Sequence, residues 1–328
     1  MKLHENIALY RDAIRFTAQQ MKLKPEYIEK DYWVTYALFS IFKSEIGKET
    51  IFKGGTALSK CYQLIDRFSE DIDLVVLRRE GETNSKLKSK LKRISQEIET
   101  VLPEITIEGI THKMGMNRKT AHAYNKEFKG NYGQVRDAII LESTWLGYYE
   151  PFTRKNIISF VGQMMLDNKQ SNIAEENGLL PFELQALKPI RTICEKIMSL
   201  VRFSYSENPI ADLKKKIRHI YDLHQLLKQD EFLEFFHSRA FDEMLIKVAN
   251  DDVVSFKNNN QWLIHHPNEA LVFKDLEKVW NTISTTYSND FKDLVYGDLP
   301  NQDDVLNTLK MIQARLKGIS WTVKIEEI

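Results

Sequence analysis

Two runs, Lys53-Gly54-Gly55-Thr56-Ala57-Leu58 and Ser69-Glu70-Asp71-Ile72-Asp73-Leu74, decide how the rest of this sequence is interpreted. The first run begins at the end of a predicted strand at 50–53, and a helix is expected from Thr56 onward. Two glycines at such a junction let the backbone approach an anion closely, and the first N–H groups of the helix point toward it. The pattern therefore predicts a phosphate-binding turn.

The second run places two aspartates on a predicted strand at 71–77. Asp71 and Asp73 stand at i and i+2, so their carboxylates face one side while Ile72 and Leu74 face the core. Like charges side by side repel, and a cation between them removes the repulsion. Mg²⁺ normally binds one or two carboxylates together with substrate phosphates. An Asp-x-Asp pair alone is more often a solvent-facing strand end, but the preceding glycine turn favours a metal site.

The remaining chain divides into a mixed half and a helical half. Helices are expected at 5–22, 25–43 and about 83–101, and strands at 104–110, 135–145 and 156–164. After Pro181 the pattern is almost wholly helical, with helices expected at about 189–203, 209–228, 231–248, 265–285 and 302–317. We therefore expect an α+β domain at residues 1–184 and an all-helical domain at residues 185–328.

The composition is that of an ordinary globular protein. The 328 residues are 43% hydrophobic and 28% charged, and 46 Lys and Arg balance 46 Asp and Glu. This composition excludes disordered and low-complexity proteins. Because the net charge is zero, the overall charge does not indicate a nucleic-acid or membrane-surface partner. The longest nearly apolar stretch, residues 33–42, is about half a membrane span. With only Cys61 and Cys194, expected as buried free thiols, the sequence indicates a cytoplasmic protein without membrane contact.

Three further segments add to the two runs a resemblance to a known family. They are Glu29-Lys30-Asp31-Tyr32-Trp33-Val34, Pro189-Ile190-Arg191-Thr192-Ile193-Cys194-Glu195-Lys196 and Arg218-His219-Ile220-Tyr221-Asp222-Leu223. With residues 54–58 and 67–74, they resemble the nucleotidyltransferases of the AbiEii/AbiGii abortive-infection toxin family, in the polymerase-β-like nucleotidyltransferase superfamily. The matches run in order from about residue 29 to residue 226, and residues 229–328 add nothing to them.

The resemblance implies a fold, an activity and partners. The fold would be an α+β polymerase-β-like nucleotidyltransferase core, a mixed sheet with flanking helices, followed by an all-helical domain. The activity would be Mg²⁺-dependent transfer of a nucleoside monophosphate from an NTP to an acceptor, with release of pyrophosphate. Because the family comprises toxins of toxin–antitoxin or phage-defence systems, a separately encoded antitoxin is the expected partner.

The same resemblance assigns roles to individual residues. It makes Asp71 and Asp73 metal ligands and catalytic residues, Lys196 and Asp222 catalytic residues, and Gly54, Gly55, Thr56, Ser69 and Lys196 nucleotide-binding residues. The wider superfamily has a third acidic residue on a neighbouring strand, for which Glu142 is the candidate and Asp137 the alternative. The strand register separates these two, because a slip of one residue turns a side chain to the other face.

Lys196 and Asp222 also have a purely structural interpretation. Lys196 flanks the apolar stripe of its predicted helix, where a lysine is most often a surface residue. Asp222 lies opposite the stripe of its own helix, so we expect it outside the core, where it can pair with Arg218. Arg191 is expected to pair with Glu195 in the same way.

A basic run, Lys214 to Lys216 with Arg218, lies just before Asp222. Such runs are usually solvated faces, yet this one lies where a polyanionic acceptor would bind, so we expect the acceptor to be RNA, with tRNA as the first candidate. Two alternatives remain open: a non-toxic nucleotidyltransferase acting on a protein or small molecule, and a catalytically silent NTP-binding interaction protein. The aspartate pair argues against the second, because a binding module needs no paired metal ligands.

Overall fold

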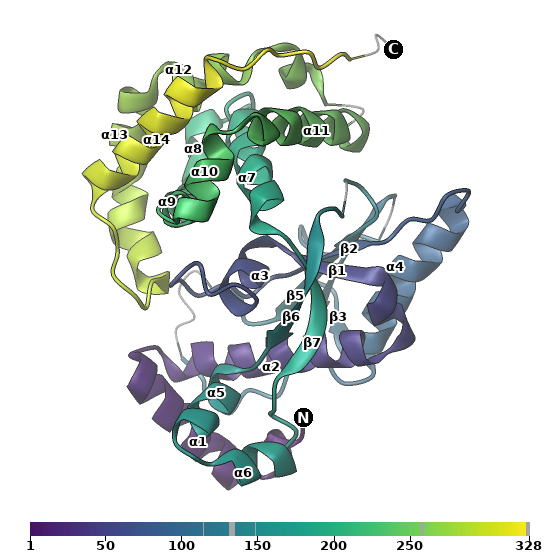
Figure 1. Cartoon of the computed structure of the whole chain (residues 1–328). Helices are drawn as coiled ribbons and strands as arrows, with labels where there is room; N and C mark the ends of the chain where they lie inside the picture. Colours follow the sequence, from purple (N-terminus) through teal and green to yellow (C-terminus); the bar gives the residue numbers. More distant parts are fainter. Residues whose placement is uncertain (114, 131–134, 148, 257–258, 326–328) are drawn as a thin grey trace. The chain divides into compact units, whose positions relative to one another are not determined.

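A seven-stranded mixed sheet lies in the first part of the chain in the computed structural model, which describes residues 1–113, 115–130, 135–147, 149–256 and 259–325 (Figure 1). The strands are β1 (Thr50–Lys53), β2 (Ile72–Val76), β3 (Glu104–Ile105), β4 (Asn117–His122), β5 (Ile139–Thr144), β6 (Phe152–Ile157) and β7 (Phe182–Leu187). They are ordered β3-β4-β5-β2-β1-β7-β6. β2 runs parallel to β5 and β1 parallel to β7, and the other neighbours are antiparallel.

Two helices, α2 (Pro25–Lys43) and α4 (Asn84–Glu99), pack against each other and against strands of the sheet. Ile72 and Leu74 are buried in the same apolar cluster as residues of both helices. Because side chains alternate along a strand, Asp73 faces the opposite side of the sheet. The other helices of this part are η1 (Leu3–Glu5), α1 (Ile7–Met21), η2 (Glu45–Glu49), α3 (Gly54–Lys60), α5 (Phe160–Asp167) and α6 (Ser171–Glu176).

The strand register aligns four charged residues across the sheet. Lys53 is paired with Asp73, Asp73 with Glu142, and Glu142 with Lys119. Residues directly opposite each other on paired strands point to the same face of a sheet. Lys53, Asp73, Glu142 and Lys119, called here the charged row, therefore lie together on the face opposite α2 and α4.

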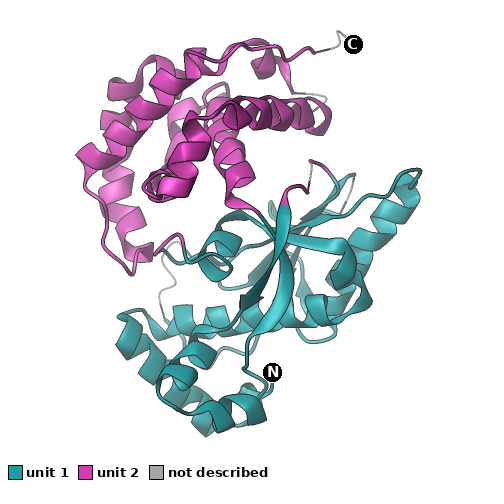
Figure 2. Ribbon diagram, in the orientation of Figure 1, with its two compact units in different colours: residues 1–63, 67–145, 152–187 teal, residues 64–66, 146–151, 188–328 magenta. Residues whose placement is uncertain are grey.

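The described chain forms two compact units (Figure 2). Unit 1 consists of residues 1–63, 67–145 and 152–187 and holds the sheet, and unit 2 consists of residues 64–66, 146–151 and 188–328. The helices of unit 2 are α7 (Pro189–Phe203), α8 (Pro209–Lys215), α9 (Ile217–Leu227), α10 (Asp230–His237), α11 (Arg239–Ser255), η3 (Gln261–Ile264), η4 (Pro267–Glu269), α12 (Leu271–Lys274), α13 (Leu276–Thr286), η5 (Tyr287–Phe291), η6 (Lys292–Leu294) and α14 (Gln302–Leu316).

The α+β class predicted from the sequence is confirmed, but the expected strand at 156–164 is wrong. β6 ends at Ile157, and the helix α5 begins at Phe160. Ser159 caps that helix, because its Oγ accepts the backbone N–H of Gly162 at 3.0 Å. The apolar residues that follow the cap belong to the helix and not to a longer strand.

Two strands were missed in the sequence. Five of the six residues of β4 are polar, so the strand has no apolar alternation, and its conformation depends on pairing with β5. In β7 the buried residues Phe182, Leu184 and Ala186 alternate with Glu183 and Gln185, which is a strand pattern at the beginning of the stretch interpreted as helical. β7 pairs with β1 and β6, so it belongs to the sheet.

Two further features concern the environment of the chain. Among the helices in the described ranges, none combines the length and apolar character that crossing a bilayer requires. Cys61 and Cys194 are buried free thiols, as predicted.

Candidate active site

The glycine turn and Asp73 are in direct contact. β1 ends at Lys53, and Gly54 follows with a φ of +81°, a left-handed conformation that glycine adopts without steric cost. A Cβ atom on Gly54 would lie 2.2 Å from Oδ2 of Asp73, so no larger residue fits there. The turn and the carboxylate singled out in the sequence are therefore immediate neighbours.

Thr56 and Ser69 join the start of α3 to the segment before β2. The hydroxyl of the buried Thr56 donates to the backbone oxygen of Asp71 at 2.7 Å and lies 3.0 Å from Oγ of Ser69. A Cβ atom on Gly55 would lie 3.0 Å from the same Oγ. The turn is therefore closely packed, and the Thr56 hydroxyl helps to fix the position of Asp71.

The charged row brings like charges together. Burial, with the neighbouring carboxylates of Glu142 and Asp71, raises the pKa of Asp73 to about 7, and Lys53 and Lys119 oppose this shift. Nζ of Lys119 lies 2.9 Å from Oε2 of Glu142, and both side chains are partly exposed. Adjacent carboxylates cost free energy, and a cation beside them would recover it.

Asp71 lies just before β2 and contacts an arginine. Nη1 of Arg136 is 3.0 Å from Oδ1 of Asp71, and 36% of the Asp71 side chain is exposed. The backbone N–H of Arg136 donates to the carboxylate of the neighbouring Glu70, at 3.1 and 3.2 Å from its two oxygens. Arg136 therefore contacts Glu70 through its backbone and Asp71 through its side chain.

Lys30 of α2 forms a buried ion pair with Glu70. Its Nζ also donates to the backbone oxygens of Arg136 and Ala138, the second at 2.8 Å. Burial raises the pKa of Glu70 and lowers that of Lys30, and the attraction between the two groups opposes both shifts. This pair therefore fixes the residue beside Asp71 to α2.

The two residues beside Lys30 on α2 hold other segments. Asp31 pairs with Lys60 of α3 at 2.5 Å and accepts the backbone N–H of Phe160 at 2.8 Å. Glu29 accepts the backbone N–H groups of residues 127 and 128, at 2.8 and 3.3 Å. All three side chains are buried. The segment Glu29-Lys30-Asp31 thus connects α2 to the parts of unit 1 that carry the site.

The register favours Glu142 over Asp137 as the third carboxylate. Glu142 is paired with Asp73 on the neighbouring parallel strand. Asp137 precedes β5, is largely exposed, and pairs with Lys126 at 2.9 Å. The hydrogen bond from Lys126 lowers the pKa of Asp137. Asp137 therefore has its own partner outside the charged row.

The carboxylates of Asp71, Asp73 and Glu142 fit a hard divalent cation that is shared with a nucleotide. In the part of the chain that the structure describes, no three Asp, Glu, His or Cys side chains converge closely enough to hold a metal ion. Mg²⁺ does not require this, because it normally takes one or two carboxylates and completes its shell with water and substrate phosphates. Asp71 and Asp73 supply such oxygens, and a cation beside them would offset both the burial and the carboxylate repulsion that raise the pKa of Asp73.

Lys196 and Asp222 form a buried ion pair in unit 2. Nζ of Lys196 lies 2.7 Å from Oδ2 of Asp222, and the side chains are 7% and 0% exposed. The prediction that Asp222 lies outside the core is wrong, and Lys196 is not a surface residue. The reason is that α7 and α9 pack together, so the helix faces beside the apolar stripes are covered as well. The predicted pair of Arg191 and Glu195 is confirmed at 3.0 Å.

Sequence reasoning missed three cations beside these carboxylates: Lys53, Lys119 and Arg136. Lys53 directly precedes the glycine turn, and that position is a signal that could have identified it. Lys119 and Arg136 meet Glu142 and Asp71 only through tertiary structure. No local sequence pattern predicts either of these two contacts.

One family of known proteins matches most of this chain. The family model described as nucleotidyl transferase AbiEii toxin, type IV TA system, matches residues 36–308, which is most of the chain. Among solved structures, the chain is similar to MenT4, the nucleotidyltransferase toxin Rv2826c from Mycobacterium tuberculosis H37Rv. That similarity covers 91% of this chain and 98% of the other, with 15% sequence identity and a TM-score of 0.45. No match was found among curated proteins.

Proposed function

Because this chain belongs to the AbiEii family of nucleotidyl transferase toxins, we propose that it transfers a nucleoside monophosphate from an NTP to RNA in the cytoplasm, with Mg²⁺ as cofactor. The contact between the Gly54 turn and the Asp73 carboxylate carries the proposal. A turn that can hold phosphate, directly beside crowded carboxylates, suits a nucleotide that arrives with a divalent cation.

The proposed reaction is an in-line substitution at the α-phosphorus of the NTP. An oxygen of the acceptor forms the new P–O bond, the bond to the bridging oxygen of the β-phosphate breaks, and pyrophosphate leaves. The turn at Gly54 and Gly55 would hold the triphosphate, with Lys53 supplying positive charge beside it. Ser69 and Thr56 keep this turn in place through the contacts described above.

Asp71 and Asp73, with Glu142 as the third candidate, would hold Mg²⁺, which when bound neutralises charge on the phosphate oxygens. We also assign the Lys196–Asp222 pair a role with the nucleotide, Lys196 as a phosphate contact and Asp222 as the group that orients it. Both residues stand in the motifs that resemble the family's, and the family model covers them. Their 2.7 Å contact fixes the direction in which Lys196 points.

The basic run beside Asp222 supports RNA as the acceptor. Lys214, Lys215 and Lys216 are partly or fully exposed, and Lys215 also pairs with Asp212 at 2.8 Å. Clustered lysines attract a phosphate backbone even in a chain of zero net charge. Modification of an RNA that translation needs, such as tRNA, would account for toxicity, and a separately encoded antitoxin would counteract it.

The proposal is tested with α-labelled NTPs, Mg²⁺ and separated RNA, protein and metabolite fractions. We expect wild-type protein to label the RNA fraction, and the variant Asp71→Asn/Asp73→Asn to lose labelling by more than roughly a hundredfold. Glu142→Gln should lower labelling, whereas Asp137→Asn, a matched change of an exposed carboxylate outside the row, should not. Raising the salt concentration should weaken RNA labelling, because phosphate contacts release counterions.

Two results would overturn parts of the proposal. Label in protein or metabolites alone would exclude RNA as the acceptor and leave nucleotidyl transfer in place. Undiminished labelling by Asp71→Asn/Asp73→Asn would remove both aspartates from the reaction.

A further inference from the structure

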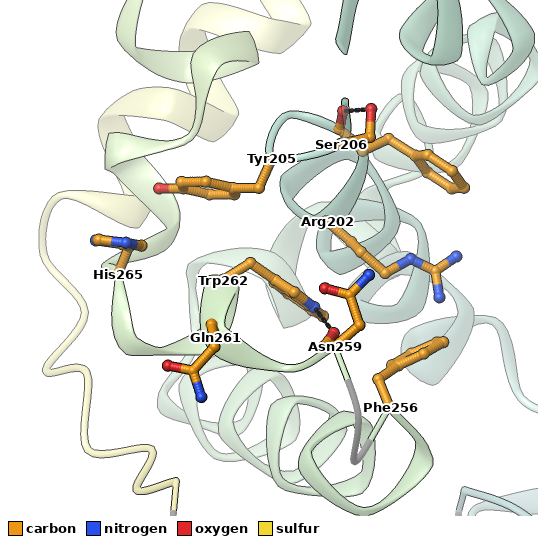
Figure 3. Close-up of a pocket in the computed structure, with 9 residues that line it drawn as sticks. Arg202, Tyr205, Ser206, Phe256, Asn259, Gln261, Trp262 and His265 are labelled. Carbon is orange, nitrogen blue, oxygen red and sulfur yellow. Dashed lines mark hydrogen bonds between the residues drawn. The ribbon is translucent and has the colours of Figure 1, made fainter. Parts of the chain in front are cut away.

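A cavity of about 440 Å³ lies in unit 2, where the C-terminal end of α7 meets η3 (Figure 3). Its volume falls within the about 300–1,000 Å³ that ligand pockets usually have. Rings, amide groups and a cation line it, among them Arg202, Tyr205, Asn259, Gln261, Trp262 and His265. None of these residues has a part in the proposed transfer reaction, so the combination needs its own explanation.

Two exposed rings of the cavity, those of Tyr205 and His265, present flat faces. Tyr205 and His265 are stacked, with ring centroids 5.2 Å apart and planes within 10° of each other. The Tyr205 side chain is exposed although it is large and aromatic. Nε1 of Trp262 donates to the backbone oxygen of Asn259 at 3.1 Å, which fixes the indole (Figure 3). Unpaired nucleobases bind proteins by stacking on faces of this kind.

Two amide side chains provide hydrogen-bonding groups beside these rings. Asn259 and Gln261 both line the cavity and are exposed. Each amide carries two donors and one acceptor oxygen, so it can match the donor and acceptor pattern along the edge of a base. The cavity therefore offers both faces and edges to a planar polar ligand.

Cations are interleaved with the rings on one side of the cavity. Cζ of Arg202 lies 4.2 Å from the ring centroid of Phe256 and 4.7 Å from that of Phe203. Nζ of Lys216 lies 4.5 Å from the ring centroid of Phe203. The basic run that indicated an RNA acceptor therefore reaches the lining of the cavity. Alternating cations and rings suit a strand of bases joined by phosphates.

We propose that this cavity binds an unpaired nucleobase of the RNA acceptor. The base stacks on the pair formed by Tyr205 and His265, and Arg202 and Lys216 attract the adjoining phosphates. The inference rests on the proposed function, since it takes the acceptor to be RNA. An apolar peptide is a poorer occupant, because it would bury the amides of Asn259 and Gln261 without matching their hydrogen bonds.

The test measures binding of a short single-stranded oligoribonucleotide in the absence of NTP, and compares it with an abasic strand of the same length. We expect wild-type protein to bind the base-containing strand more tightly. Tyr205→Leu should weaken that binding about tenfold, as expected for one stacked base, and should leave abasic binding unchanged. Tyr205→Phe keeps the ring and should retain binding. Lys216→Gln should weaken both strands, because it removes only charge.

Phe16→Leu is the matched control, because Phe16 is an exposed aromatic residue that lines another cavity of about 450 Å³ in unit 1. It should bind as wild type does, and the thermal unfolding midpoint of each variant reports whether it is folded. Equal affinity of wild type for both strands, or equal loss of both in Tyr205→Leu, would overturn the proposal. Binding of a free nucleoside monophosphate but not of RNA would also overturn it. RNA that is bound but never labelled would contradict the proposed function and leave the base-binding cavity standing.

Discussion

The charged residues of α2 and those of the charged row differ in how their charges are satisfied. Glu29, Lys30 and Asp31 are fully or almost fully buried, and each contacts an opposite charge or backbone N–H groups. In the charged row, Asp73 and Glu142 are adjacent carboxylates, and their repulsion helps to raise the pKa of Asp73. Folding accounts for the first group but would select against the second. Charges that the fold does not explain are the better candidates for chemistry.

Removing Lys30 should give the largest loss of stability. Lys30→Met leaves the Glu70 carboxylate buried without its partner, so we expect the unfolding free energy to fall by about 3–5 kcal/mol in urea titrations. The double variant Lys30→Met/Glu70→Leu removes both charges and should lose less than the sum of the two single changes. Additive losses would show that the two residues do not act as a pair.

The Lys196–Asp222 ion pair of unit 2 is expected to contribute both to stability and to nucleotidyl transfer. Asp222→Leu leaves Lys196 buried with its charge, and should lower the unfolding free energy by roughly 3 kcal/mol. Adding Lys196→Met should restore part of that stability. Transfer per folded molecule should stay reduced by more than about tenfold in the double variant. Recovery of activity together with stability would make the pair structural only.

The raised pKa of Glu29 should be visible in the pH dependence of the unfolding free energy. Burial raises the pKa of folded Glu29 to about 7, so the folded state binds more protons than the unfolded state between about pH 4.5 and 7. The Glu29 contribution therefore lowers the unfolding free energy, by roughly 1–3 kcal/mol, as the pH rises through this interval. Glu29→Gln lacks that dependence. Urea titrations at pH 5 and pH 8 should show the wild type losing its advantage over Glu29→Gln, and a constant difference would contradict the assignment.

The exposed end of the charged row should matter least for stability. Lys119 and Glu142 form a partly exposed pair, and such pairs contribute at most about 1 kcal/mol. Lys119→Gln should therefore shift the thermal unfolding midpoint by only a few degrees. A loss as large as that of Lys30→Met would place this pair with the structural charges of α2.

The sequence was sufficient for what depends on neighbouring residues. The glycine run after the first strand predicted a turn, and Gly54 lies against Asp73 of β2, whereas Asp71, expected on the same strand, lies just before it. It was insufficient where distant segments decide the outcome. The burial of Asp222 follows from the packing of α7 on α9, and the contact of Lys119 with Glu142 follows from the pairing of β4 with β5. Likewise, the motif at Glu29 gave no sign that its side chains hold three different segments.

The central claim is that the charged row serves nucleotidyl transfer while the charges of α2 serve the fold. The most direct test compares Asp73→Asn with Asp31→Asn, two identical carboxylate-to-amide changes, by the rate of label transfer from α-labelled NTP per folded molecule. We predict that Asp73→Asn loses transfer and keeps or gains stability, because a repelling charge is removed. Asp31→Asn should lose stability, since Lys60 loses its partner, but keep its rate per folded molecule. Transfer that survives in Asp73→Asn, or disappears from folded Asp31→Asn, would contradict the account.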